Sequence, residues 1–296
     1  MTTPILSPLE PLWQHAAAQN FPTHTLYVVA TPIGNLSDIT VRALYVLNLC
    51  DAIACEDTRH SKPLLQQYGI RKHLIAVHDH NEVEAAQDLI ARLQSGERIA
   101  LISDAGTPAI SDPGARVVAA VRAAGLSVVP LAGPSAAITA MSAAGLQGGF
   151  LFAGFLSSKT QARLTELTEL ANTAAHLIFY EAPHRLHESI AAMATVLPDR
   201  QIIIIKELSK LHESITAFAL ADADAWLKSA PAPRGEYVLI VSAPTSNAAQ
   251  TEEWHTTLVT LLEELPLKQA VALTVKLTGA SKNVVYTAAL ALKNAD

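Results

Sequence analysis

Short apolar runs alternate with amphipathic stretches over the first half of the chain. The runs that predict buried strands are, in order, Leu26–Ala30, Asp51–Cys55, Leu74–Val77, Arg98–Ile102 and Leu126–Pro130. The stretches that predict helices are Ile39–Leu49, Lys62–Tyr68, Asn81–Gln94, Ala115–Ala124 and an Ala-rich segment that starts after Ser135 and ends near Gly145. Strand alternating with helix at this spacing predicts a mainly parallel sheet with helices on both faces.

The pattern changes between residues 145 and 150 and predicts a second α/β domain. Its strands are expected at Phe150–Phe155, His176–Tyr180, Gln201–Lys206, Ser214–Leu220 and Glu236–Val241, and its helices at Ser158–Asn172 and Leu186–Leu197. The later strands follow one another with no predicted helix between them, which indicates a mixed sheet. A Ser/Asn/Ala/Pro linker over Ala243–Gln250 separates this domain from an all-helical remainder.

These patterns divide the chain into four parts. We expect an N-terminal extension at 1–24, an α/β domain at 25–147, a second α/β domain at 148–243 and a helical domain at 251–296. Four helix starts carry a capping side chain in the sequence, namely Asp38, Asn81, Ser281 and Asp112, the last with Pro113 in the first turn.

Composition and charge narrow the function classes. Half of the 296 residues are apolar and the formal net charge is −6, which argues against broad electrostatic capture of nucleic acid. Beyond Pro266 the net charge is positive, because this part of the chain contains four lysines and one aspartate, which sum to +3. There a helix, a turn containing Gly279 and another helix resemble a helix-turn-helix. A solvated surface and a small nucleic-acid-binding unit both remain open for this region.

Cysteine usage and apolar run length indicate a cytoplasmic protein. Cys50 and Cys55 are too few for a disulfide framework and wrongly spaced for zinc, so we expect buried free thiols. The first 24 residues lack the basic start and apolar core of a signal peptide. No apolar run approaches the ~18 residues that span a bilayer. His78 and His80 stand two apart without a further ligand set, and no metal site is expected.

The stretch 103–114, Ser-Asp-Ala-Gly-Thr-Pro-Ala-Ile-Ser-Asp-Pro-Gly, is the first candidate site. It follows the strand ending at Ile102, and open α/β sheets place ligands at such strand ends. Gly106 and Gly114 permit a close backbone approach or a positive φ, while Pro108 and Pro113 restrict the shape of the loop. The alternative is a tight strand-to-helix connection with an ordinary helix cap.

Six motifs occur together in order and carry a family resemblance. They are Leu26–Leu36 with Thr-Pro-Ile-Gly-Asn, Glu56-Asp57-Thr58-Arg59, His78-Asp79-His80-Asn81-Glu82, the 103–114 loop, Gly133-Pro134-Ser135-Ala136 and Phe179-Tyr180-Glu181-Ala182-Pro183-His184-Arg185. With them, residues 25–243 resemble the bacterial 16S rRNA (cytidine-2′-O)-methyltransferases of the tetrapyrrole methylase superfamily. The resemblance implies a two-domain α/β fold, with a parallel sheet first and a mixed sheet second, and a small all-α C-terminal domain.

The resemblance also implies a cofactor and a reaction. S-adenosyl-L-methionine would bind between the two α/β domains, and the methyl group would go to the ribose 2′-oxygen of a cytidine in the decoding region of small-subunit rRNA. The positions that match the superfamily's cofactor loops are Pro32, Ile102, Ser103, Asp104, Ala105, Gly106, Thr107, Ser135, Ala136, Tyr180 and Leu208. Homodimerisation is usual in the superfamily and is expected here.

The substrate hydroxyl needs a base or a hydrogen-bond acceptor near it, because it is a poor nucleophile at neutral pH. Asp57 and Glu181 are the candidates, since each ends a predicted strand. The alternative for Asp57 is an ion pair with Arg59. For Glu181 it is a pair with His184 or Arg185.

Basic residues near the same strand ends and in the tail are candidates for RNA phosphates. They are Arg59, Lys62, His184, Arg185, Lys276 and Lys282, with solvated surface charge as the competing explanation. The expected partner is small-subunit rRNA or the assembled 30S subunit. Two other function classes stay open: a methylase of a tetrapyrrole or a modified protein residue, and a protein that binds adenosylmethionine without turnover.

Overall fold

The computed structural model describes residues 9–230, 232–244 and 246–293. The chain forms two compact units. The first comprises Met1–Ala143 and Ile205–Ser214, and the second comprises Ala144–Ile204 and Ile215–Asp296. The Ile205–Ser214 segment falls inside the range 148–243 that the sequence assigns to the second domain, yet its contacts are with the first unit.

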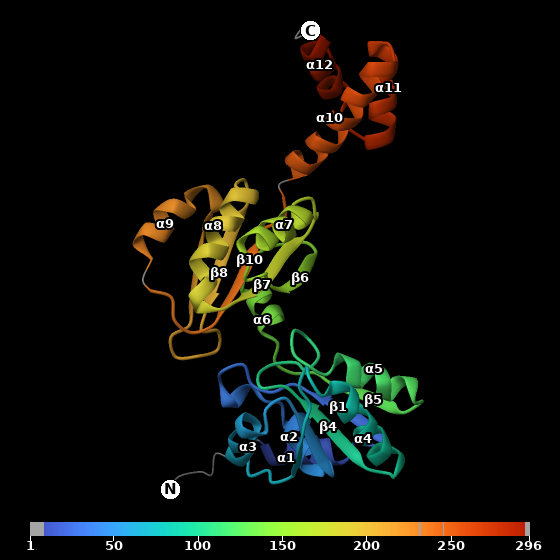
Figure 1. The fold of residues 1–296 in the computed structure, drawn as a ribbon, viewed down its shortest axis with the longest axis vertical. Coiled ribbons are helices and arrows are strands. Elements are labelled where there is room, and N and C mark those ends of the chain that lie inside the picture. The colour runs from blue at the N-terminus through green and yellow to red at the C-terminus, as the bar shows by residue number, and fades with distance from the viewer. Residues whose placement is uncertain (1–8, 231, 245, 294–296) are drawn as a thin grey trace. The chain divides into compact units, whose positions relative to one another are not determined.

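The first unit contains a five-stranded sheet with strand order β3-β2-β4-β1-β5. Figure 1 labels three of its strands, β1, β4 and β5. Its strands are β1 (Thr25–Val29), β2 (Ala52–Cys55), β3 (His73–Ala76), β4 (Arg98–Ile102) and β5 (Ser127–Leu131). Its helices are α1 (Leu9–Ala17), α2 (Val41–Leu49), α3 (Thr58–Gln67), α4 (Glu82–Gln94), α5 (Ala115–Ala123) and α6 (Ala136–Ala143), with a 3₁₀ turn at Leu36–Asp38. Every strand pairing in this sheet is parallel, which confirms the prediction.

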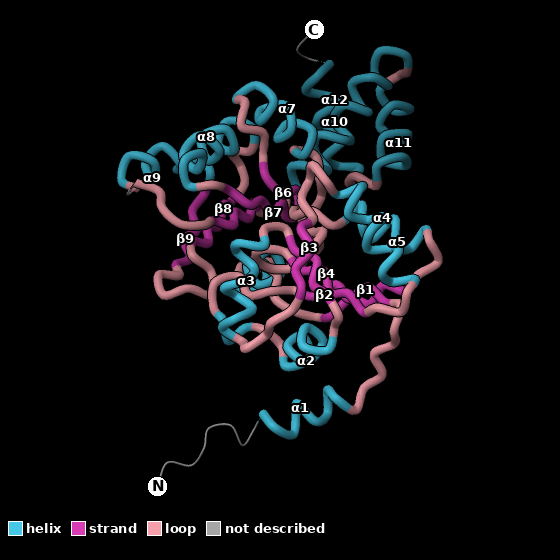
Figure 2. The backbone as a smooth tube through the Cα atoms, turned by 60° about the horizontal axis from the view of Figure 1, so that its bottom comes forward, coloured by secondary structure: helices cyan, strands magenta, loops and turns pink. Residues whose placement is uncertain are grey.

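Alternate residues of each strand pack into two cores on opposite faces of this sheet. Tyr27 and Val29 of β1 join a core with α2 and α3. Leu26, the residue before Tyr27, packs into the other core, to which α4 and α5 contribute. Figure 2 shows α2 on one side of the strands and α4 and α5 on the other. Cys50 and Cys55 are buried free thiols, as predicted, and burial raises the pKa of Cys50 to about 12.

Several helix starts differ from the prediction. The N-terminal extension contains α1, which no pattern indicated, and the Trp13 ring contacts Tyr45 of α2 at 5.3 Å between centroids. The cap of α2 is Thr40, whose hydroxyl accepts from the N–H of Ala43, and Asp38 instead ends the preceding 3₁₀ turn. Helix α3 begins at Thr58 rather than at residue 62, since Asp57 caps it.

Helix α5 is capped from another helix and not by Asp112. Its N-cap residue is Gly114, which has no side chain to offer and a φ of 125°. The buried carboxylate of Glu82, at the start of α4, accepts from the N–H of Gly114 at 2.8 Å and from that of Arg116 at 2.9 Å. The negative charge also opposes the positive end of the α5 dipole. One long-range side chain therefore satisfies two backbone donors at the end of the 103–114 loop.

Replacing Glu82 by Ala is expected to lower the free energy of unfolding by about 2 kcal/mol, because two buried N–H groups lose a charged acceptor. Urea denaturation followed by circular dichroism measures the change. Glu84→Ala, an exposed residue in the same first turn of α4, is the matched control and should shift the midpoint little. Equal midpoints for the two variants would contradict the capping role.

The second unit contains a five-stranded sheet with strand order β6-β7-β10-β8-β9 (Figure 1). Its strands are β6 (Phe150–Phe155), β7 (His176–Glu181), β8 (Gln201–Lys206), β9 (Ser214–Ala219) and β10 (Tyr237–Val241). Its helices are α7 (Thr160–Leu170), α8 (Leu186–Val196) and α9 (Ala223–Ser229), with 3₁₀ turns at Pro183–Arg185 and Leu220–Asp222. β7 pairs parallel with β6 and antiparallel with β10, so the sheet is mixed as predicted.

All three of these helices contribute to one core cluster with β7, β8 and β10. Helix α9 was not predicted. It is short, and its Trp226 stacks on Phe218 of β9 with centroids 5.3 Å apart. The contact explains why a segment with weak local signals is helical, because tertiary packing stabilises it.

The C-terminal region consists of α10 (Ser246–Glu264), α11 (Leu267–Thr278) and α12 (Lys282–Lys293). Leu258, Val271 and Val285, one from each helix, share a buried core. The linker predicted over Ala243–Gln250 is helical from Ser246 onward. Gly279 ends α11 in the left-handed conformation with a φ of 70°, as expected of a glycine at that position. Within the described ranges, no helix is both long and apolar enough to cross a membrane.

Candidate functional site

The strand order places a topological switch point between β1 and β4. These strands are neighbours, but the chain leaves β1 toward β2 on one side and leaves β4 toward β5 on the other. In open α/β sheets, ligands bind beyond the carboxyl ends of the strands at such a point. The segments that follow these two strands contain Pro32 and the 103–114 loop. The fold therefore directs attention to two of the stretches that the sequence had selected.

Backbone hydrogen bonds join these two loops directly. The N–H of Thr31 donates to the carbonyl of Gly106 at 2.9 Å, and the N–H of Gly106 donates to the carbonyl of Thr31 at 3.0 Å. The buried Thr31 hydroxyl donates to the carbonyl of Ser103 at 3.0 Å. The loop that contains Pro32 is consequently held by hydrogen bonds against the predicted run from Ile102 to Thr107.

The loop after β5 joins the same structure. The Thr107 hydroxyl donates to the carbonyl of Pro134 at 2.9 Å, next to Ser135 and Ala136. Gly133 lies against the end of β1, where an added Cβ atom would be 2.8 Å from Cβ of Ala30. Any larger residue at 133 must push the two loops apart. Three strand-end loops thus depend on a close approach that glycine permits.

Gly133→Ala is expected to destabilise the first unit by ~1–3 kcal/mol, because overpacking at a rigid contact forces the backbone to shift. The clash is between two Cβ atoms, since the next nearest atom of Ala30 is 3.7 Å away. Adding Ala30→Gly should therefore restore much of the stability. Thermal melting of both variants checks this. A double variant that melts below Gly133→Ala would show that the clash is not the cause.

The Ile205–Ser214 segment brings Leu208 to the loop after β1. The aliphatic part of Lys210 covers Gly34, with Cγ at 2.5 Å from the position of a Cβ there, and the Ser209 hydroxyl donates to the Asp38 carboxylate. Glu207 and Ser209 have φ values of 53° and 65°, which are unfavourable for side chains of this kind. Such strained residues cluster at ligand sites and switch regions. Leu208 lies between these two residues, in a segment that belongs to the first unit.

Carboxylates gather at this edge of the sheet, and one of their oxygens lacks a partner. Oδ1 of Asp104 is buried and accepts no hydrogen bond from the part of the chain that the structure describes. Burial raises the pKa of Glu56, and the charges of Asp104 and Asp112 raise it further. Burial likewise raises the pKa of Asp112, with Asp104 adding to the effect. The edge therefore suits a ligand that is cationic and offers hydrogen-bond donors. Neither Glu56, which directly follows β2, nor Asp112, which lies in the 103–114 loop, was among the predicted cofactor-binding or catalytic residues.

Asp57 has the ion-pair partner that the sequence offered as the alternative to a catalytic role. Its Oδ2 accepts from Nη2 of Arg59 at 2.7 Å, and its Oδ1 accepts from the N–H of Arg59 at 2.8 Å. These hydrogen bonds lower the pKa of Asp57 to about 2, so it is ionised at neutral pH. The side chain is still 33% exposed and keeps room to accept a further hydrogen bond.

Glu181 is more completely engaged. Its side chain is 1% exposed. Oε1 accepts from the N–H of Ala182 at 2.8 Å and from Nε of Arg185 at 3.0 Å, and Oε2 accepts from the Ser189 hydroxyl. Arg185 also donates to the carbonyl of Leu156 at 3.3 Å. Glu181 and Arg185 are therefore mutual partners within the second unit, which also holds Tyr180 and His184.

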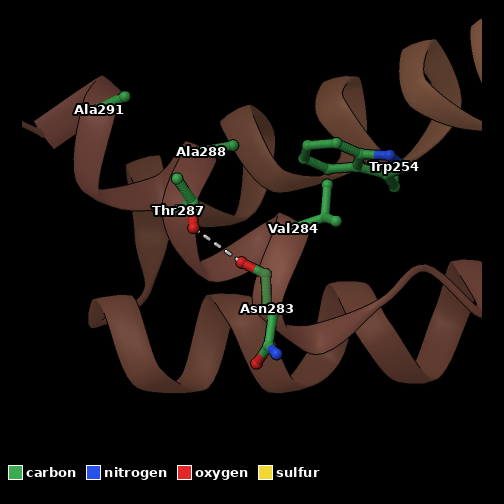
Figure 3. A pocket seen from close by; sticks show the side chains of 6 residues that line it. All are labelled: Trp254, Asn283, Val284, Thr287, Ala288 and Ala291. Atoms are coloured by element: carbon green, nitrogen blue, oxygen red, sulfur yellow. Dashed lines mark hydrogen bonds between the residues drawn. The ribbon is translucent and has the colours of Figure 1, made fainter.

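The C-terminal helices form a pocket of about 460 Å³ that no charged residue lines (Figure 3). Its walls are Trp254, Asn283, Val284, Thr287, Ala288 and Ala291. The Thr287 hydroxyl donates to the carbonyl of Asn283 at 2.9 Å, so it is satisfied within α12. Lys276 and Lys282 are exposed near the turn between α11 and α12 and do not line this pocket. Among the described residues no group of three or more His, Cys, Asp and Glu side chains is arranged to hold a metal ion.

The fold and this strand-end site agree with the comparison to known proteins. Residues 25–224 match the family model Tetrapyrrole (Corrin/Porphyrin) Methylases, and the chain belongs to that family of methyltransferases. The donor that such a family implies is of the S-adenosylmethionine type. Residues 248–293 match the RsmI C-terminal HTH domain. The resemblance stated from the six motifs is thereby confirmed.

Curated relatives resemble the whole chain. It is 47% identical over 284 residues to ribosomal RNA small subunit methyltransferase I of Escherichia coli O157:H7, covering 94% of this chain and 98% of the relative. The protein of that name from Pseudomonas aeruginosa is 48% identical, covering 90% and 96%. Among solved structures, diphthine synthase superposes with a TM-score of 0.58 at 17% identity, covering 77% of this chain and 93% of that one. The cobalt precorrin-4 methyltransferase CbiF gives 0.55 at 14%, covering 74% and 95%. These structural matches show the shared fold.

Proposed function

We propose that this protein transfers a methyl group from S-adenosylmethionine to the ribose 2′-oxygen of a cytidine in the decoding region of 16S rRNA. The observation that supports this most is the identity of 47–48% with ribosomal RNA small subunit methyltransferase I proteins over at least 90% of the chain. The helix-turn-helix match at residues 248–293 supports an RNA substrate.

The residues of the first unit fit the proposed donor. When bound, S-adenosylmethionine supplies a methyl group activated by a sulfonium cation. Asp104 has a buried oxygen that no described residue partners and that can accept from an amine or a ribose hydroxyl, and the neighbouring carboxylates favour a cation. Pro32, the run Ile102–Thr107, Ser135, Ala136 and Leu208 provide the backbone that holds the donor. Tyr180 is the proposed contact from the second unit.

Asp57 is the better placed of the two candidate acceptors. It is ionised and partly exposed, so it can accept the 2′-hydroxyl hydrogen bond and orient that oxygen toward the methyl group. Its low pKa suits orientation rather than complete proton removal. Glu181 remains a candidate only if its partners release it, because both of its oxygens already accept hydrogen bonds.

The residues proposed to contact RNA differ in exposure and in whether a carboxylate pairs with them. Lys62, Lys276 and Lys282 are exposed, whereas Arg59 and Arg185 are paired with carboxylates, and His184 lies beside Arg185. The protein is proposed to act in the cytoplasm, where its substrate is found. A homodimer is proposed as well, since β6 is an edge strand that exposes Phe150, Leu151 and Phe155.

Transfer of labelled methyl from S-adenosylmethionine to isolated small subunits tests the function. The expected result is label in one ribose of the 16S rRNA, located by nuclease digestion and mass analysis. Label on a tetrapyrrole or on a protein residue would instead support the small-molecule or protein methylase. Binding of adenosylmethionine without transfer to any of these substrates would support a sensor.

A further inference from the structure

A second cavity lies on the first unit, between α3 and the edge strand β3. Its volume is about 930 Å³, within the range of ligand sites, and no candidate cofactor residue lines it. Ten residues form its walls and floor: Thr58, Arg59, Lys62, Leu65, Gln66, Ile70, Arg71, Lys72, His73 and Leu74. We call this cavity the α3–β3 groove.

Cations line both walls of the α3–β3 groove. Arg59, Lys62 and Gln66 are spaced three and four residues apart, so they share one face of α3. Arg71, Lys72 and His73 come from the turn after α3 and the first residue of β3. Four arginine and lysine side chains thus meet at one groove of a protein whose net charge is −6.

Most of this charge is not neutralised by the protein. Arg59 is paired with Asp57. For Lys62, Arg71 and Lys72, no ion pair is formed with any residue in the described ranges. Lys62 and Arg71 are exposed and Lys72 is half-buried. Unpaired cations on facing walls are the arrangement that binds phosphate groups.

The floor and the polar groups of the groove suit the remainder of a nucleotide. Leu65 and Ile70 lie almost fully buried beneath it, and with the partly exposed Leu74 they make its floor apolar. Thr58 and Gln66 add a hydroxyl and an amide that can hydrogen-bond to a ribose. Apolar floor and cationic rim together match a single RNA strand, whose bases are free to stack and whose backbone is anionic.

The direction of α3 connects the groove to the candidate site. Helix α3 begins at Thr58, beyond the carboxyl end of β2. Strand β3 begins at His73, where the amino ends of the parallel strands lie. Asp57 caps α3 at the first of these ends. The groove therefore runs from the strand-end loops toward the far edge of the sheet, over the ~15 Å length of a ten-residue helix.

We propose that the α3–β3 groove binds the phosphate backbone of the RNA strand that flanks the methylated nucleotide. This inference rests on the proposed function and extends it to a defined surface. Arg71 and Lys72, which no sequence motif selected, are assigned to phosphate binding together with Lys62. Arg59 stands where the strand leaves the candidate site.

The test compares two full-length double variants that lose the same charge. Lys62→Gln/Arg71→Gln removes two groove cations, and Arg122→Gln/Lys228→Gln removes two exposed cations on α5 and α9. A fluorescent single-stranded RNA oligonucleotide of mixed sequence reports Kd by anisotropy across salt concentrations. Methyl transfer to isolated small subunits reports KM and kcat. Calorimetry with adenosylhomocysteine and thermal melting verify that both variants keep the donor site and the fold.

The groove variant is expected to bind the oligonucleotide at least ~10-fold more weakly, with a salt slope smaller by about 1 for each cation removed. Its KM for small subunits should rise while kcat stays near wild type, and the control variant should match wild type. Equal Kd and KM for the two variants would overturn the proposal. So would a KM increase with unchanged oligonucleotide binding, which would place a ribosomal protein in the groove. If the wild type transfers no methyl, the proposed function fails, and the oligonucleotide measurement still decides the groove.

Discussion

Replacing Glu181 by Ala is expected to lower the free energy of unfolding of the second unit by ~3–5 kcal/mol, because the partly buried guanidinium of Arg185 loses an enclosed carboxylate partner. Nε and Nη2 of Arg185 lose the carboxylate oxygen that both of them contact. The Ser189 hydroxyl loses the oxygen to which it donates. The N–H of Ala182 is left unsatisfied at the end of β7. Urea denaturation monitored by circular dichroism measures the loss.

The size of the effect should depend on which partner is removed. Ser189→Ala removes one hydrogen bond and is expected to cost about 1 kcal/mol. Glu169→Ala, at an exposed position of α7, serves as the control and should be neutral. A Glu181→Gln variant that keeps wild-type stability but loses its single-turnover rate of methyl transfer would contradict this structural role. Glu181 would then regain its place as the candidate base.

Asp104→Asn is expected to weaken binding of the methyl donor without lowering the stability of the free protein. Adenosylhomocysteine should bind ~10–100-fold more weakly in calorimetry, since a hydrogen bond to a charged acceptor contributes about 1.5–3 kcal/mol. The melting temperature of the free protein should stay the same or rise. The reason is that Oδ1 has no partner to lose within the described part of the chain, and the Asp104 charge repels Glu56 and Asp112.

The pH dependence of this stability follows from the raised pKa values. A carboxyl whose pKa is higher in the folded state binds its proton more tightly there. It therefore stabilises the fold at low pH, and that contribution is lost as pH rises above the pKa of the unfolded chain. Any stability gain of Asp104→Asn should accordingly be present near pH 7 and shrink toward pH 3. Asp51→Asn, outside this carboxylate group, is the control for donor binding. Wild-type affinity in Asp104→Asn would refute the ligand role of Asp104.

Buried strands were predicted closely because their signal is local. Arg98–Ile102 and Gln201–Lys206 begin and end where the sequence indicated. A strand covered on both faces is a continuous apolar run between turn residues, and both features are visible without knowledge of the fold. Helices α1 and α9 were missed because their local patterns are weak. Each packs through an aromatic ring contact with another element, Trp13 on Tyr45 and Trp226 on Phe218, and such contacts are not visible in a local pattern.

Helix caps show where local inference fails. Asp112 precedes Pro113 in a sequence typical of a helix start, yet the N–H of Gly114 donates to Glu82, which lies 32 residues before Gly114 in the chain. Asp57 follows a strand at the expected place, but it caps α3 and pairs with Arg59. A short polar side chain has several backbone and side-chain partners within reach, and the tertiary structure decides among them.

The sequence by itself determined most of the elements, though not α1 and α9, and also the class of fold and the family, because periodicity, turn residues and ordered motifs are properties of the chain. The tertiary structure decided which loops meet. Thr31 pairs with Gly106, and Ala30 contacts Gly133, only because β1 lies between β4 and β5 in the sheet. It also decided the surroundings of each charge: an Asp104 oxygen has no partner among the described residues, Glu181 is enclosed, and the cations of α3 and of the turn after it line one groove. Burial and neighbouring charge depend on residues far apart in the chain, so no local pattern encodes them.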